Sequence, residues 1–115
     1  MNIEILNAFE EMTSASNKVH SLNGEMNRLS ELVGVLSEKV KAYREEGDNL
    51  GANAIANIAL DDIKPEIDCL YEDFHKSTKE FEQKTKRLKN VCAFHGINVQ
   101  LGKDNKVINF YKGSI

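Results

Sequence analysis

The strongest constraint on the fold is an unbroken heptad repeat of apolar residues from residue 5 to residue 43. One heptad position holds Ile5, Met12, Val19, Met26, Val33 and Val40, and the other holds Ala8, Ala15, Leu22, Leu29, Leu36 and Tyr43. In a chain that is 41% hydrophobic, chance gives twelve such residues in one frame with a probability on the order of 10⁻⁵. The spacing places all twelve on one stripe, which predicts a helix over about residues 2–45 that packs against another helix.

A second helix is predicted over about residues 52–92, after a turn at residues 46–51. Gly47 can take the left-handed conformation that ends a helix, and Asp48 or Asn49 can cap the next helix. The second helix has a seam of its own, formed by Leu60, Ile67, Phe74, Phe81 and Leu88 at one position and by Ala56, Ile63, Leu70, Ser77, Lys84 and Val91 at the other.

The two seams align as an antiparallel hairpin. Facing residues in such a hairpin have numbers with a constant sum, and a sum of 96 pairs Leu29 with Ile67 and places the centre of the turn at residue 48. Two layers set an apolar residue against a polar one, because Met12 faces Lys84 and Val19 faces Ser77. We therefore expect looser packing there, with the lysine stem along the seam and its ammonium in water. A parallel dimer of the first helix is the alternative arrangement that its seam permits.

Pro65 interrupts the second helix, because proline cannot donate a backbone hydrogen bond and clashes with the preceding turn. A bend is therefore expected near residue 65, after a short segment over residues 52–63. This segment is apolar on more than one face, since Ile55 and Ile58 lie off the seam. Two helices cannot cover both isoleucines, so a homo-oligomer is expected, with Ile55 and Ile58 at the interface of a dimeric bundle.

The last part of the chain has the two-residue period of a β-strand. Ile97, Val99 and Leu101 alternate with polar residues, residues 102–105 have the composition of a turn, and a second apolar run covers residues 107–111. Gly96 is placed to end the preceding helix. The predicted fold is mainly α: a long antiparallel, coiled-coil-like helical hairpin over residues 1–92, with a β-hairpin tail over residues 93–115.

Charge is divided unevenly along the chain. Residues 1–75 hold six Lys and Arg against fifteen Asp and Glu, a net charge of −9, whereas residues 76–115 hold nine against three, a net charge of +6. Such asymmetry suggests that one end binds an anionic partner. The candidate binding residues are Lys76, Lys79, Lys86, Arg87, Lys89, Lys103 and Lys106.

The sequence contains no motif for catalysis, a cofactor or a metal. Cys92 and His95 have the spacing of one pair of zinc ligands, but a structural zinc needs four ligands and no second pair is present. The glycines of residues 47–51 lack the spacing and the lysine of a phosphate-binding loop. No apolar run reaches the roughly 18 residues that a membrane span requires. With no signal peptide, the expected location is the cytoplasm of the cell or of an infected host, where Cys69 and Cys92 stay reduced.

Three functional hypotheses remain open. The first is a non-enzymatic protein-protein interaction module, an oligomeric scaffold, adaptor or inhibitor of a larger partner. Small acidic helical proteins of this kind resemble phage and mobile-element products that act on host machinery. The second is nucleic-acid binding through the basic C-terminal end, in an oligomer whose helical hairpin and β tail resemble the plan of phage DNA-packaging small subunits. The third is an oligomer that binds a small anionic ligand.

Overall fold

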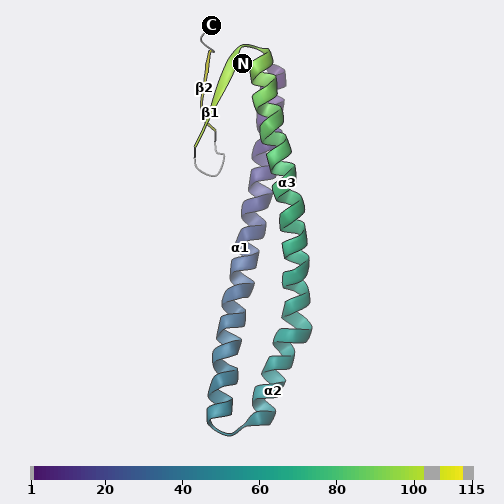
Figure 1. The fold of residues 1–115 in the computed structure, drawn as a ribbon, viewed down its shortest axis with the longest axis vertical. Helices are drawn as coiled ribbons and strands as arrows, with labels where there is room; N and C mark the ends of the chain where they lie inside the picture. Colours follow the sequence, from purple (N-terminus) through teal and green to yellow (C-terminus); the bar gives the residue numbers. More distant parts are fainter. Residues whose placement is uncertain (1, 103–106, 113–115) are drawn as a thin grey trace. The chain divides into compact units, whose positions relative to one another are not determined.

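The computed structural model describes residues 2–102 and 107–112 and confirms the predicted fold class (Figure 1). A long helix, α1 (Ile3–Glu45), is followed by α2 (Asn49–Ile58), the π-helix η1 (Ala59–Ile63) and α3 (Lys64–Phe94), which together form one continuous helical segment. Strands β1 (Ile97–Leu101) and β2 (Val107–Lys112) form an antiparallel hairpin. The chain divides into two compact units: the first comprises Met1–Val19 and Ser77–Ile115, and the second His20–Lys76.

The ends of the helices are set by the capping residues that the sequence indicates. The side chain of Asn2 accepts a 2.8 Å hydrogen bond from the Glu4 amide at the start of α1. At the turn, Gly47 has a φ of 84°, and Asp48 accepts a 2.8 Å hydrogen bond from the Gly51 amide. Because Asp48 is the cap, α2 begins at Asn49, three residues before the predicted start. Gly96, with a φ of 72°, follows the end of α3.

The first unit contains a hydrophobic core between the beginning of α1 and the end of α3. Its buried members are Ile5, Ala8, Met12, Ala15, Phe81, Leu88 and Cys92.

Two ion pairs beside this core agree with the predicted alignment. Glu11 pairs with Lys84 at 3.3 Å and with Arg87 at 2.9 Å, so the paired residue numbers sum to 95 and 98, close to the predicted 96.

The expectation of looser packing at this end is wrong. Met12 and Ser77 are both only 3% exposed, and Val19 is half-buried against the core. A buried serine is small enough to be accommodated in the seam. Lys84 is half-buried, and its ammonium ends beside Glu11. The β-hairpin also covers part of this core. The predicted alignment considered contacts between the two helices only.

The β-hairpin packs on the helices of the first unit through one face. Ile97, Val99, Val107 and Phe110 contact the helical core, and the ring of Phe110 meets that of Phe9 edge-on at 5.8 Å. Asn98 and Gln100 alternate with the inward residues of β1 and are exposed. The register is irregular between Gln100 and Leu101. The predicted turn residues 103–105 lie outside the described part of the chain.

The second unit holds the turn and the π-helix, and its seam is less buried. Leu29, Ala52 and Ile63 are its buried apolar residues. The π-helix lies immediately before the predicted bend, and the Lys64 amide donates to the Ala59 carbonyl in place of an α-helical bond. This is one way to accommodate Pro65, which cannot donate to the carbonyl four residues earlier.

Two predicted seam residues are exposed in this unit, Tyr43 by 37% and Leu60 by 58%. The heptad pattern pairs Leu60 with Leu36, but the more buried positions around it are Ala56, Ala59 and Ile63. The seam of the second helix therefore passes beside Leu60, which lies at its edge.

Candidate functional site

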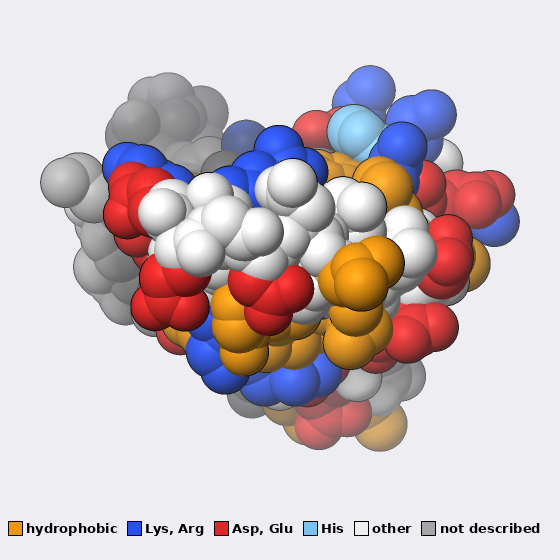
Figure 2. All heavy atoms as spheres, turned by 90° about the horizontal axis from the view of Figure 1, so that it is seen from below, with side chains coloured by type: hydrophobic (Ala, Val, Ile, Leu, Met, Phe, Trp, Pro, Cys, Tyr) orange, Lys and Arg blue, Asp and Glu red, His pale blue; other side chains and the backbone are white. Residues whose placement is uncertain are grey.

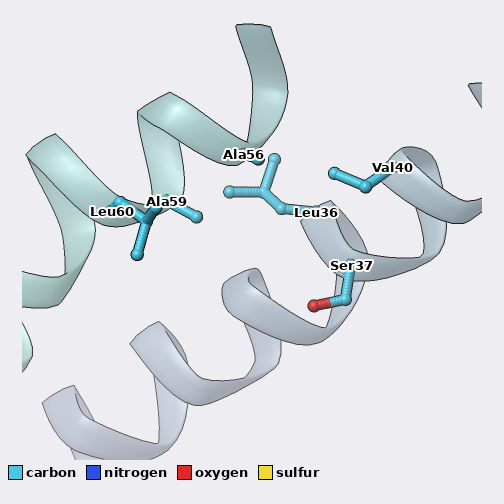
Figure 3. A pocket seen from close by; sticks show the side chains of 6 residues that line it. All are labelled: Leu36, Ser37, Val40, Ala56, Ala59 and Leu60. Atoms are coloured by element: carbon cyan, nitrogen blue, oxygen red, sulfur yellow. The ribbon is translucent and has the colours of Figure 1, made fainter. Parts of the chain in front are cut away.

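The clearest candidate binding site is an open apolar pocket in the second unit. It has a volume of about 270 Å³ and is lined by Leu36, Ser37, Val40, Ala56, Ala59 and Leu60 (Figure 3). Leu36 and Val40 of α1 face Ala56 of α2 across the pocket (Figure 3). The pocket forms because two alanines occupy positions where larger side chains would fill the space, and because Leu60 lies at the edge of the seam. We call it the apolar pocket.

Cationic side chains lie beside the apolar pocket on α1. Lys41 and Arg44 follow Ser37 by four and seven residues, which places them on the same face of the helix. Both are exposed, and neither makes an ion pair with another described residue. The arrangement offers a hydrophobic recess with positive charge on its α1 side, while Asp61 and Asp62 follow Leu60 on the η1 side.

A second pocket of about 390 Å³ lies beside the seam of the same unit. It is lined by Lys39, Ala42, Tyr43, Glu46 and Ile55, and we call it the mixed pocket. Figure 2 looks onto the end of the second unit that carries the turn and shows hydrophobic side chains among acidic and basic ones. Of the two predicted interface residues, Ile55 lines this pocket and is half-buried, and Ile58 is 47% exposed.

The predicted basic residues of the first unit fall into two groups. Lys79, Lys86 and Lys89 are exposed and make no ion pair with a described residue. Arg87 is engaged by Glu11, as is Lys84. The acidic start of α1 thus neutralises part of the basic end of α3.

The remaining predicted basic residues lie elsewhere. Lys76 belongs to the second unit, where it pairs with Glu72 at 3.5 Å. Lys103 and Lys106 lie outside the described residues. Of the predicted basic residues that the structure describes, Lys79, Lys86 and Lys89 are therefore the ones that are exposed on α3 without an ion pair.

Cys92 and His95 are occupied by other interactions. His95 lies 3.2 Å from Glu4, and Cys92 is fully buried in the core, where burial raises the pKa of its thiol. No group of three or more potential metal ligands occurs among the described residues. In the same part of the chain, no helix is long and apolar enough to cross a bilayer.

Comparison of the chain with protein-family models, curated proteins and solved structures gave no significant match. The function of the protein is therefore inferred from its pockets and its charges. The heptad pattern did not predict the apolar pocket, although the pair of alanines at residues 56 and 59 just before Pro65 is the sequence signal that could have indicated it.

Proposed function

We propose that the protein is a non-enzymatic interaction module that binds an amphipathic helix of a partner protein in the apolar pocket. The observation that carries the proposal is the exposure of Leu60 at the mouth of a pocket lined almost entirely by apolar side chains. Helix-in-groove recognition uses recesses of this kind, with apolar residues of the bound helix as anchors. A role as scaffold, adaptor or inhibitor would follow from the partner that is bound.

Charge complementarity defines the chemistry of the bound helix. Lys41 and Arg44 lie beside the pocket and have no anionic partner among the described residues. The expected ligand therefore carries a row of small apolar side chains and an acidic flank. Only small anchors are expected because the volume of about 270 Å³ is at the lower end for a ligand site.

The test uses a fluorescent 20-residue amphipathic peptide with a row of Ala and Val side chains and a Glu flank. Fluorescence anisotropy with the full chain should show binding, and the same peptide with Lys in place of Glu should bind at least tenfold more weakly. Leu60→Ser should weaken binding about tenfold. Loss of the apolar contact that the Leu60 side chain makes with the peptide should reduce the binding free energy by about 1.4 kcal/mol.

Leu50→Ser is the matched control. Leu50 is 86% exposed in the same unit and is not among the residues that line the pocket, so this variant should bind the acidic peptide as the wild type does. Equal binding of the acidic and basic peptides, an equal effect of the two leucine variants, or no binding would each contradict the proposal.

Nucleic-acid binding is a second candidate, favoured by the exposed lysines of α3. Lys79 and Lys86 are seven residues apart and lie on one row of the helix, with Lys89 one turn further along. Binding of a 20-nucleotide duplex or single strand should weaken linearly on a log–log plot against salt. Lys86→Ala should lower the slope by about 1, whereas Lys64→Ala in the second unit should not. Absence of binding at about 50 mM salt, or binding insensitive to salt, would exclude this candidate.

A further inference from the structure

We propose that the outer face of the β-hairpin enters the major groove of duplex DNA and reads adenine through the side-chain amides of Asn98, Gln100 and Asn109. The proposal rests on nucleic-acid binding, the second candidate function above, and adds the element that contacts the bases. Three observations support it: the register of the hairpin, the chemistry of its outer face and the charge of the first unit.

The outer face of the hairpin carries four polar side chains in two cross-strand pairs. Asn98 of β1 is opposite Tyr111 of β2. Gln100 of β1 is opposite Asn109 of β2. All four residues are exposed, because the residues that alternate with them pack on the helical core, and none of their side chains hydrogen-bonds to another described residue. We call this surface, with its three amides and one phenol, the amide face.

The amide face is not what a stable hairpin favours. Asn is depleted in β-strands, where β-branched and aromatic residues are preferred, and a two-stranded hairpin is only marginally stable. Asn98 and Asn109 therefore weaken the hairpin relative to threonine at the same positions. Residues that depart from the preference of their element, with no contact in the protein to compensate, are expected at functional surfaces.

A two-stranded β-ribbon has the width that the major groove of DNA accepts. Paired strands lie about 4.8 Å apart, and the major groove is about 12 Å wide. The amide of Asn or Gln donates a hydrogen bond to N7 of adenine and accepts one from its N6 amino group, so one side chain identifies one base. Since the other face of the hairpin packs on the helices, the amide face is the one that can meet the bases.

The charge of the first unit favours DNA over an uncharged ligand such as a sugar. The unit holds nine Lys and Arg against six Asp and Glu, a net charge of +3. Lys112 follows Tyr111 at the end of β2, is exposed and makes no ion pair with a described residue. A cation beside the amide face is placed to contact a phosphate at the edge of the groove, which positions the ribbon on the duplex.

The test compares the full chain on two fluorescent duplexes of equal length, one of A·T and one of G·C base pairs. Fluorescence anisotropy should show about tenfold tighter binding to the A·T duplex, because the bidentate pairs with adenine are lost on the other. Replacing adenine by 7-deazaadenine removes the N7 acceptor from the major groove and leaves the minor groove unchanged. This replacement should lower the affinity for the A·T duplex toward that for the G·C duplex.

Variants of the amide face separate base contacts from phosphate contacts. Asn98→Thr/Asn109→Thr removes two amides and keeps the hairpin, because threonine favours β-strands. The double variant should lose most of the preference for A·T base pairs, while the salt dependence of binding, which reports phosphate contacts, stays that of the wild type. Asn90→Thr is the matched control: Asn90 is exposed on α3 of the same unit, and this variant should keep the preference.

Three outcomes would overturn the proposal. Absence of binding to both duplexes would exclude it together with the second candidate function. Salt-dependent binding that Lys86→Ala weakens, with equal affinity for the two duplexes, would exclude the amide face and leave the lysines of α3 as the binding surface. A preference for A·T base pairs that neither 7-deazaadenine nor the double variant reduces would show that another surface of the protein reads the DNA.

Discussion

Thr85 is a buried polar residue, and the burial of its hydroxyl group does not stabilise the protein. Its side chain lies in the first unit, it is 6% exposed, and its hydroxyl has no hydrogen-bond partner among the described residues. A buried hydroxyl that lacks a partner costs free energy because its hydrogen bond to water is lost and not replaced. Phe81 and Leu88 lie one helical turn before and after Thr85 on α3, and both are buried apolar residues of the core.

Replacing this hydroxyl by a methyl group should stabilise the protein. We expect Thr85→Val to raise the free energy of unfolding by about 1 kcal/mol, because the shape is kept and the desolvated hydroxyl is removed. Urea unfolding followed by circular dichroism measures the change. Thr13→Val, at a half-buried position of α1, should change stability by less than about 0.5 kcal/mol. A loss of stability in Thr85→Val would show that the hydroxyl is satisfied.

At the scale of the element, the turn between α1 and α2 depends on one cap. Asp48 accepts the Gly51 amide at 2.8 Å, and a Cβ added at Gly51 would lie 2.6 Å from Oδ2 of that carboxylate. The aspartate and the glycine are therefore coupled: a side chain at residue 51 would require the Asp48 carboxylate to move from its present position.

Removal of the cap should destabilise the second unit. Asp48→Ala should lower the free energy of unfolding by about 1 kcal/mol, whereas Asp48→Asn, which keeps an acceptor oxygen, should lower it much less. Gly51→Ala should lower stability less than Asp48→Ala does, because the added methyl group displaces the carboxylate but alanine has a higher helix propensity than glycine by about 1 kcal/mol. Thermal and urea unfolding provide the measurement. Equal stability of Asp48→Ala and Asp48→Asn would show that the hydrogen bond contributes nothing.

The helices show which elements a local pattern can predict. The start of α1, the left-handed glycines and the end of α3 follow from local hydrogen bonding, so Asn2, Gly47 and Gly96 predicted them to within a few residues. Pro65 predicted a defect in the second helix but not its form. A missing amide donor can be accommodated by a kink, a break or a wider turn, and neighbouring packing decides among them. The π-helix is the outcome here.

At the scale of the whole molecule, folding redistributes the charge. A division of the chain at residue 75 gives −9 and +6, but the first unit joins both ends of the chain and holds nine Lys and Arg against six Asp and Glu. Its net charge is +3, and that of the second unit, with six against twelve, is −6. The basic end is thus weaker as an anion-binding surface than the linear sequence suggests, because Glu11 lies beside Lys84 and Arg87.

Periodic and local patterns in the sequence predict the helical hairpin, its alignment and the β-hairpin. Heptad spacing, helix caps and strand alternation are such signals, and burial of an apolar stripe leaves few arrangements. Which surfaces stay open is set by tertiary packing. The β-hairpin packs against the core of the first unit, and the buried seam of the second unit passes beside Leu60. Both results depend on contacts between residues distant in sequence, which a repeat pattern does not encode.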